Sequence, residues 1–351
     1  VNDTERGVVW EEVIIMLPQH VKMIFLSATT PNMVEFSEWI GRTKQREVHV
    51  ISTPKRPIPL EHSLYHDKKR YVVMDEKGHF LNNGYRKVAN LISGKDTSKP
   101  TPASKNKARN RPTGRGGKGR GPAKGAGGNG KRGGRRRGGA DKSQWTGLIR
   151  MLQKDDLLPV VIFSFSKKVC MGSARVLQNM DLTTAKEKSK IHVFCQNAIL
   201  RLGESDRGLP QVTFMLKLLR HGIGVHTGGL LPIVKEIVEI LFSRGLVRVL
   251  FATETFAMGV NMPARTVLFN GTRKHDGVSF RDLLPGEYTQ MSGRAGRRGL
   301  DSVGTVLVAA WGDKLPEVTD LHHMLKGRAT KLSSQFRLTY TMSEYSNSKE
   351  L

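Results

Sequence analysis

The sequence predicts an α/β fold of doubly wound parallel sheets. Strand-like apolar runs alternate with helix-like segments along most of the 351 residues, which is the pattern of a parallel sheet covered by helices. The run 159–165 is apolar almost throughout, as a strand buried on both faces requires. A hydrophobic content of 38% and this length suffice for about two domains. Ligands of such sheets bind at the carboxyl ends of the strands.

The first predicted domain region is short and ends at a proline-rich connector. Its expected elements are a helix end, a strand, a helix and a strand, at 13–17, 22–26, 34–41 and 48–51. Gly41 is the expected stop of the second helix. Pro54, Pro57 and Pro59 then stiffen the chain, because proline fixes φ and cannot donate to a ladder. We therefore place domain one at 1–53 and a linker at 54–62.

The second predicted domain covers 63–327 and is followed by a short terminal region, 328–351. A strand at 60–65 precedes a low-complexity segment, and a helix from Trp145 follows it. Four further strands are expected at 159–165, 247–252, 266–269 and 305–308. Helices are expected at 169–180, 232–243 and 287–294.

Charge is concentrated in one segment of the chain. The protein has 57 Lys and Arg against 31 Asp and Glu, a net charge of +26. Residues 95–142 hold 16 of these cations and two acids, hence +14, together with 13 glycines. Such a segment cannot bury enough surface to order itself, so we predict a disordered insertion. It is either a solvated tail without a specific role or an auxiliary RNA contact, since Arg-Gly-Gly occurs at Arg115, Arg132 and Arg137.

Several classes of protein are excluded by composition and pattern. Cys170 and Cys195 are far apart in sequence, so neither a disulfide framework nor a cysteine-rich zinc site is predicted. No apolar run of about 18 residues indicates a membrane span. A glycine pattern at 125–130 imitates a dinucleotide loop, but neither a strand nor a helix flanks it, and we reject that interpretation. The opening residues do not form a signal peptide and read as a cut edge within a longer protein.

The segment 290–299, Gln-Met-Ser-Gly-Arg-Ala-Gly-Arg-Arg-Gly, carries the strongest chemical signal. A helix beginning near Glu287 would place Gln290, Arg294 and Arg297 on one side, because residues three and four apart share a helix face. Two guanidinium groups so placed can contact the oxygens of a transferring phosphoryl group. The alternative is a basic, exposed helix end.

This segment resembles motif VI of superfamily-two helicases, and further motifs follow the order of that family. Ser27, Ala28 and Thr29 match motif III, and Phe163-Ser-Phe-Ser166 matches motif IV. The stretch 253–261 resembles motif V. The resemblance implies RecA-like sheets of a P-loop helicase, with the first domain incomplete and with 328–351 as the truncated start of a winged-helix region.

Longer stretches narrow the resemblance to the superkiller-type DExH RNA helicases of the exosome-cofactor branch. Residues 251–264, 273–277 and 335–341 carry it. Residues 41–44 and 51–62 look more like the cytoplasmic superkiller helicase than its nuclear relative. The family implies an ATP-dependent 3′-to-5′ RNA helicase that delivers RNA to exosome-mediated decay. The rival interpretations are a non-catalytic RNA-binding scaffold and a DNA helicase relative.

The resemblance assigns roles to individual residues. Arg294 and Arg297 would act as arginine fingers and Gln290 would sense the γ-phosphate of ATP. Gly259 and Asn261 would approach the nucleotide. The motif III residues 27–29 would couple ATP state to the RNA.

Three residues of the second domain would line the RNA path by the same resemblance. Ser164 and Thr253 would hold the RNA backbone. His226 is either an RNA-path residue or a satisfied core or turn histidine. The stretch 270–286 is either a strand-separating β-hairpin or a plain surface loop.

The family also implies cofactors, partners and a location. ATP and Mg²⁺ would be bound by a phosphate loop and an Asp-Glu-Val-His box, which the sequence lacks, so we expect no ATP hydrolysis by this chain alone. The implied partners are single-stranded RNA, the tetratricopeptide-repeat and WD-repeat subunits of the superkiller complex, and the RNA exosome. We expect a cytoplasmic protein without membrane contact, with a nuclear location as the alternative.

Overall fold

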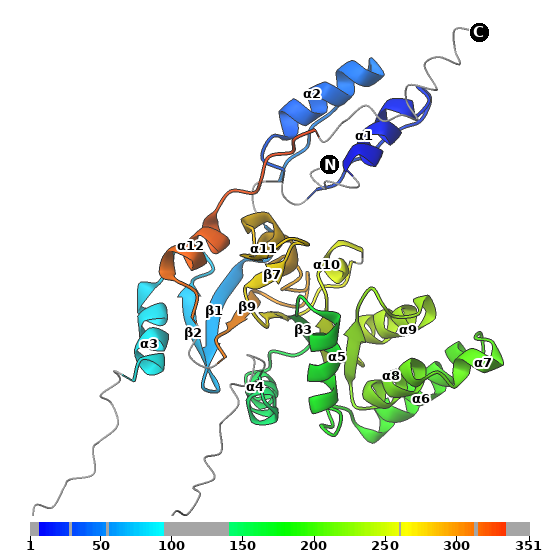
Figure 1. The fold of residues 1–351 in the computed structure, drawn as a ribbon, viewed down its shortest axis with the longest axis vertical. Helices are drawn as coiled ribbons and strands as arrows, with labels where there is room; N and C mark the ends of the chain where they lie inside the picture. Colours follow the sequence, from blue (N-terminus) through cyan, green and yellow to red (C-terminus); the bar gives the residue numbers. More distant parts are fainter. Residues whose placement is uncertain are drawn as a thin grey trace, which may run out of the picture.

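A seven-stranded sheet in the order β2-β1-β9-β6-β3-β5-β4 forms the centre of the fold (Figure 1). The computed structural model describes residues 7–27, 30–53, 56–94, 140–259, 261–311 and 315–334. Neighbouring strands are parallel, except that β1 and β2 pair antiparallel. The strands of this sheet are β1 (Leu60–His66), β2 (Lys69–Met74), β3 (Val160–Phe163), β4 (Ile223–His226), β5 (Val249–Ala252), β6 (Thr266–Phe269) and β9 (Gly304–Ala309). The predicted α/β class with a mainly parallel sheet is confirmed.

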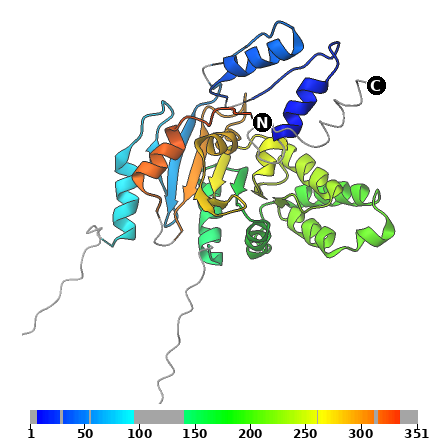
Figure 2. The same cartoon turned by 45° about the horizontal axis from the view of Figure 1, so that its top comes forward.

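Helices cover this sheet and extend its flanks. Those preceding β4 are α1 (Gly7–Met16), α2 (Met33–Lys44), α3 (Asn82–Ile92), α4 (Lys142–Lys154), α5 (Lys167–Val176), α6 (Ala185–Ile199), α7 (Glu204–Arg207) and α8 (Pro210–Arg220). Those after it are α9 (Pro232–Ser243), α10 (Thr255–Gly259), α11 (Pro285–Ser292) and α12 (Val318–Lys326). Figure 2 shows α1 and α2 standing apart from the body of the sheet.

Local sequence signals set the ends of several elements. Asp141 accepts a hydrogen bond from the Gln144 amide, and the Gln144 side chain accepts one from the Asp141 amide, so a capping box begins α4. Thr184 and Glu187 begin α6 in the same way. The four residues of β3 are fully buried between helices, which explains their continuous apolar character.

The expected strands 22–26 and 48–51 do not form. No described residue pairs with either stretch, and Leu26 and Ile51 are each 92% exposed. An apolar run becomes a strand only when a neighbouring strand satisfies its backbone groups, so these predictions were wrong. The helix expected at 34–41 continues past Gly41 to Lys44. Gln45 then adopts the left-handed conformation that ends it.

Some elements were missed, and one predicted segment lies largely outside the structure. The strands β2 and β4 and the helices α3, α6, α7, α8, α10 and α12 were not predicted from the sequence. Of the predicted insertion 95–142, residues 95–139 lie outside the described residues, whereas Lys142 already belongs to α4. The division into 1–53, 54–62 and 63–327 stays a prediction, although β1 begins at Leu60. No helix among the described residues is long and apolar enough to span a membrane.

Candidate nucleic-acid interface and nucleotide site

The carboxyl ends of the central strands meet at one edge of the sheet, which we call the carboxyl edge. Ala252 pairs with both Phe163 and His226, so β3, β4 and β5 end side by side. Ser164 and Thr253 follow directly. The structure therefore brings the three predicted RNA residues together at the edge where parallel sheets bind ligands.

Ser164 is held within the protein rather than presented on its surface. Its side chain is 3% exposed, and its hydroxyl accepts a hydrogen bond from Asn270 Nδ2 at 3.0 Å. The Asn270 carbonyl in turn accepts from Trp311 Nε1 at 2.7 Å. The predicted contact of Ser164 with RNA would therefore use the Ser164 backbone or require its side chain to rearrange.

His226 has the environment of a core histidine. It is 6% exposed, its Nε2 lies 2.6 Å from Glu239 Oε1, and its ring packs edge-on against Phe256. Its Nδ1 is buried without a hydrogen-bond partner among the described residues. Thr253 is half-buried, and its hydroxyl lies 3.1 Å from that of Thr255. This geometry favours the core alternative for His226.

A β-hairpin projects beyond the carboxyl edge. Strands β7 (Arg273–His275) and β8 (Phe280–Asp282) pair antiparallel, so the stretch 270–286 contains a hairpin and not a plain loop. Gly277 takes a φ of 106° at its turn, a conformation that side chains rarely adopt. Val278 is 92% exposed and Phe280 66% exposed near the tip.

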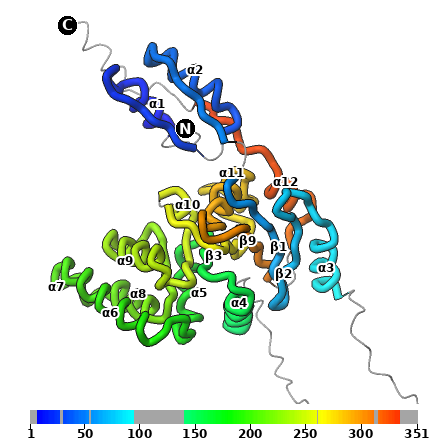
Figure 3. The backbone as a smooth tube through the Cα atoms, turned by 180° about the vertical axis from the view of Figure 1, so that it is seen from behind, coloured from blue at the N-terminus to red at the C-terminus, as the bar shows by residue number. Residues whose placement is uncertain are grey.

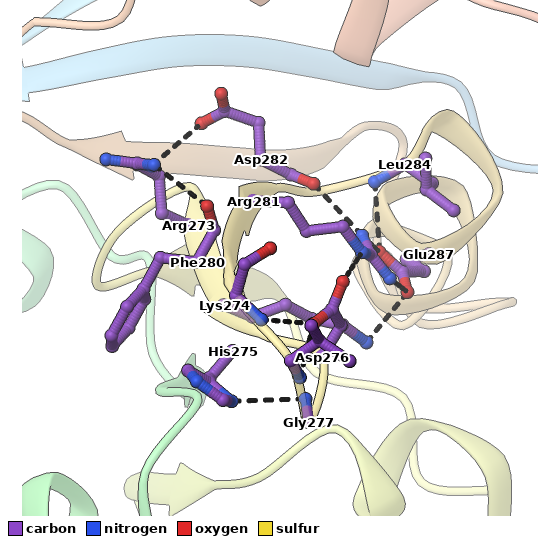
Figure 4. A network of polar contacts seen from close by, with 12 residues as sticks. Arg273, Lys274, His275, Asp276, Gly277, Phe280, Arg281, Asp282, Leu284 and Glu287 are labelled. Atoms are coloured by element: carbon purple, nitrogen blue, oxygen red, sulfur yellow. Dashed lines mark hydrogen bonds and ion pairs between the residues drawn. The ribbon is translucent and has the colours of Figure 1, made fainter.

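Four charged residues, Lys274, Arg281, Glu254 and Glu287, here called the ion cluster, tie this hairpin to motif V and, through α11, to motif VI. Figure 4 labels three of them, Lys274, Arg281 and Glu287. Lys274 Nζ lies 2.7 Å from a carboxylate oxygen of Glu254 in motif V and 2.7 Å from Glu287 in α11. Arg281 donates from Nη1 and Nη2 to the two oxygens of Glu287 at 2.9 and 2.7 Å. The hairpin is thereby fixed to both motifs by its own cations.

The side chains of the ion cluster are largely shielded from solvent, and their charges interact strongly with one another. The Lys274 side chain is 14% exposed and that of Glu287 is 17% exposed. Burial by itself would raise the pKa of Glu287, but the hydrogen bonds from Arg281 and Lys274 lower that pKa to about 2. Burial by itself would lower the pKa of Lys274, but its carboxylate partners Glu254 and Glu287 raise that pKa above its ordinary value.

The motif VI arginines lie beyond the end of α11, not on one helical face. The helix ends at Ser292, so Gln290 is helical, whereas Arg294 and Arg297 belong to the turn that follows. Gly296 takes a φ of 86° in this turn, which a continuing helix cannot accommodate. The predicted helix 287–294 and its shared face were therefore wrong in this detail.

The same turn lies at the opposite edge of the sheet, the amino edge. Ala295 forms a parallel bridge with Ala264, two residues before β6 begins, and Gly296 donates to the Ala264 carbonyl at 2.8 Å. Arg265 adjoins this bridge and lies 3.6 Å from Asp301, the partner of Arg297. The predicted RNA residues thus lie at the carboxyl edge, where ligands were expected. The predicted ATP arginines lie at the amino edge instead.

The two arginines are held differently. Arg294 Nη2 donates to the carbonyl of Ala257 in α10, and burial lowers the pKa of Arg294. Arg297 donates from Nε and Nη2 to both oxygens of Asp301 at 2.8 and 2.9 Å, and these bonds raise the pKa of Arg297. Both side chains remain cationic, because a guanidinium does not lose its proton in proteins. Among the described residues the Arg294 side chain is bonded only to a neutral carbonyl, so it is the freer of the two to bind an anion.

Of the remaining predicted nucleotide residues, Gly259 and Asn261 lie close in sequence to the hydrogen-bond partner of Arg294, and Gln290 lies in the helix that precedes it. Gly259 and Asn261 are exposed and follow Ala257, the partner of Arg294, by two and four residues. Gln290 is half-buried in the last turns of α11.

Motif III is only partly within the structure. The Ser27 hydroxyl accepts a hydrogen bond from Thr30 at 2.6 Å. Ala28 and Thr29 lie outside the described residues. The predicted coupling role of 27–29 therefore stays a prediction.

Arg56 is a functional-site residue that sequence reasoning missed. It donates from Nη2 to the carbonyls of Gly293 at 2.8 Å and Ala295 at 2.6 Å, and from Nε to Ile58 at 2.7 Å. Burial lowers its pKa. The connector arginine thus satisfies carbonyls on both sides of Arg294 and fixes that turn. Its only sequence signal is its place beside Lys55 among the prolines of the connector.

The amino edge fits the anionic part of a nucleotide but not its metal. Arg294 and Arg297 offer guanidinium donors suited to phosphate oxygens, and Asn261 offers an exposed amide. Within the described part of the chain, no group of three or more His, Cys, Asp or Glu side chains is placed to hold a metal ion. These residues can therefore hold phosphate, and Mg²⁺ would need other ligands.

Comparison with known proteins shows which proteins this chain is similar to. Residues 172–299 match the helicase conserved C-terminal domain. Over 97% of its length, the chain is 52% identical to superkiller complex protein 2 of Mus musculus and 50% identical to the antiviral helicase SKI2 of Saccharomyces cerevisiae. It is 43% identical to the exosome RNA helicase MTR4 of Mus musculus. The matched regions cover 26%, 28% and 30% of these three relatives, so the chain spans about a quarter of their length. Over that part, the chain contains most of a helicase conserved C-terminal domain and is similar to the superkiller-type RNA helicases.

Proposed function

We propose that this chain supplies the second-domain part of an ATP-dependent RNA helicase motor, with ATP handled at the amino edge and RNA at the carboxyl edge. One observation carries the proposal. The helix α11 bears Glu287 of the ion cluster in its first turn and leads into Arg294 beyond its last turn. At 1.5 Å per residue its eight residues span about 12 Å. A single rigid element therefore joins the two edges.

At the amino edge the chain's own groups would stabilise charge on a transferring phosphoryl group. Arg294 would turn its unused guanidinium donors to the γ-phosphate, and Arg297 would approach while Asp301 orients it. Gln290, Gly259 and Asn261 would complete the contact with the nucleotide. ATP with Mg²⁺ supplies the phosphoryl group, and an arginine finger of this kind accelerates its transfer by about 10³ to 10⁵.

At the carboxyl edge the chain would hold RNA by its backbone. Contacts to phosphate and sugar carry no base information, so no sequence preference is expected. Thr253 and the backbone at Ser164 would touch the strand, and the exposed hairpin tip would part an incoming duplex. The ion cluster would keep this tip fixed while α11 moves with the nucleotide state.

The wider setting follows from the names of the relatives. The names superkiller complex protein 2, antiviral helicase SKI2 and exosome RNA helicase MTR4 support a role in RNA delivery to the exosome. The 3′-to-5′ direction of movement is part of the proposal and has no support in these names. The identity is higher to the superkiller proteins than to MTR4, which favours the superkiller complex, its tetratricopeptide-repeat and WD-repeat subunits and the cytoplasm. RNA helicase names also argue against a DNA helicase.

A chimera tests this proposal. Residues 1–351 would replace the matching segment of the yeast SKI2 protein, and RNA-stimulated ATP turnover and duplex unwinding would be measured. We expect both activities in the chimera and none in the isolated chain. A chimera that binds RNA but neither hydrolyses ATP nor unwinds would instead support the non-catalytic scaffold.

A further inference from the structure

We propose that the groove between α4 and the β1–β2 hairpin is a second RNA site that binds the phosphate backbone. This proposal goes beyond the helicase function, because the groove shares no residue with either edge of the motor. The groove has a volume of about 890 Å³. Its lining contains one carboxylate, Asp155, and six cationic side chains, which are Lys68, Lys69, Arg70, Lys142, Arg150 and Lys154.

One wall is a basic stripe along α4. Lys142, Arg150 and Lys154, with Thr146 between the first two, follow one another at four-residue intervals and therefore share one helix face. The opposite face is buried in the core. Like charges four residues apart destabilise an isolated helix by about 0.2–0.5 kcal/mol per pair, so folding alone does not explain this spacing.

The other wall is the turn that joins β1 and β2. Asp67 and Lys68 have φ values of 43° and 62°, as in the tight turns of two-residue hairpins. The stem of Lys68 lies over Gly147 of α4, where an added Cβ would come within 3.0 Å of the lysine Cγ. The absence of a side chain at Gly147 thus lets the two basic walls approach each other.

Most of these cations have no side-chain partner among the residues that the structure describes. Arg70 pairs with Glu61 at 2.7 Å. For the side chains of the other five, the described part of the chain provides neither an ion pair nor a hydrogen bond. Each of these five cations can therefore bind an external anion without first breaking an ion pair to a described residue.

The side chains that line the groove favour a phosphate backbone as the ligand. It contains no aromatic side chain on which a base could stack, and Met151 is its one large apolar residue, so the contact would be electrostatic and independent of sequence. From Lys142 to Lys154 the stripe runs for about 18 Å, which matches an extended polyanion better than a single small ion. The helix α4, which forms one wall of the groove, lies at the opposite end of the sheet from α11, as Figure 1 and Figure 3 both show.

The test compares two variants of the intact chain that lose the same charge. The groove variant carries Lys68→Gln, Lys69→Gln, Arg150→Gln and Lys154→Gln. The control variant carries Lys186→Gln, Lys190→Gln, Lys217→Gln and Arg220→Gln on α6 and α8. Binding of a fluorescein-labelled RNA of mixed sequence would be followed by anisotropy over a series of KCl concentrations, after circular dichroism has confirmed folding.

We expect the groove variant to bind RNA at least about tenfold more weakly at low salt, with a salt slope lower by roughly 3, because each phosphate contact to a single strand contributes about 0.7. The control variant should keep the slope of the parent chain. RNA should also protect Lys68, Lys69 and Lys154 of the parent chain from acetylation, as read by mass spectrometry. Equal slopes for both variants, unprotected groove lysines, or displacement of the RNA by polyglutamate of matched charge would overturn the proposal.

Discussion

The two edges of the sheet differ in how their functional residues are held. At the carboxyl edge, Ser164 and His226 are buried and bonded to neighbours, and the ion cluster fixes the hairpin through buried charge pairs. At the amino edge, Arg294 is bonded to one backbone carbonyl and Arg297 to one carboxylate. The first edge is built to stay in place, whereas the second retains cationic donors for a ligand.

This difference separates residues that touch a ligand from residues that position others. Lys274 and Glu287 use their charges on each other and on Glu254 and Arg281, so they act through the hairpin and α11. In the part of the chain that the structure describes, the Arg294 guanidinium is bonded to one neutral carbonyl and to no other group. Substitutions at the amino edge should therefore change the rate of ATP hydrolysis. Substitutions in the ion cluster should change the stability of the fold and the amount of unwinding per ATP hydrolysed.

The largest expected effect is on ATP turnover at the amino edge. In the yeast chimera, Arg294→Lys should lower RNA-stimulated turnover by about 10³-fold, or roughly 4 kcal/mol of barrier, because lysine cannot reproduce the planar donors of a guanidinium. RNA affinity should be unchanged. The matched control is Arg298→Lys at the exposed neighbouring arginine. A loss of turnover no larger than that of the control would remove Arg294 from the nucleotide site.

The next effect concerns the stability of the carboxyl edge. Glu287→Gln should lower the free energy of unfolding by about 3 kcal/mol, because Lys274 and Arg281 would lose their shared, largely buried carboxylate. Urea titration of the chain measures this. Glu236→Gln, whose carboxylate is half exposed and 3.7 Å from Arg201, should change little. Equal effects for the two variants would show that the ion cluster does not hold the hairpin.

A pH dependence tests the packing between the two edges. His62 Nδ1 lies 2.6 Å from the hydroxyl of Tyr288 in the middle of α11. Burial, with a smaller effect from Arg56, lowers the pKa of His62 from 6.5 to about 3. The unfolded chain therefore takes up a proton below pH 6.5 while the folded chain does not, and stability falls as the pH falls.

Over the first two pH units below 6.5, this loss should reach about 3 kcal/mol. The lowered pKa of Glu287 adds its own loss only below 4.5, its ordinary value. Urea titrations at a series of pH values measure both ranges. His62→Asn should flatten the upper range and leave the lower one, and a slope in the upper range that survives this substitution would contradict the assignment.

The smallest effect tests close packing at the amino edge. A Cβ at Gly304 would lie 2.7 Å from the backbone carbon of Ala295, so Gly304→Ala must displace the motif VI turn. We expect a loss of roughly 1–3 kcal/mol in thermal or urea unfolding. Gly172→Ala in α5, where nothing lies within 4 Å, serves as the control and should be neutral or stabilising. A neutral Gly304→Ala would show that the turn is not held tightly.

Much of the parallel sheet was predictable, because continuous apolar runs such as that at Val160–Phe163 mark strands buried on both faces. The strand at Thr266–Phe269 and the helix at Pro232–Ser243 formed with the predicted bounds. The stretches around Leu26 and Ile51 misled the prediction, since an apolar run does not reveal whether a pairing strand exists.

The site was predictable in its residues but not in its geometry. The sequence pattern at 290–299 selected Arg294 and Arg297, yet it did not show that α11 ends before them or that they lie at the amino edge. Arg56 was missed because its three carbonyl partners are contributed by segments far along the chain and by the connector itself. Motif order in the sequence identifies chemistry, whereas the edge at which a residue lies depends on the path of the backbone.

The most direct test of the two-edge account measures unwinding per ATP hydrolysed in the yeast chimera carrying Lys274→Met. This variant keeps the length of the side chain and removes the charge that joins the hairpin to motif V and α11. The account predicts that the number of base pairs opened per ATP falls while RNA-free ATP turnover is unchanged. A proportional loss of unwinding and turnover, or no loss of either, would contradict it.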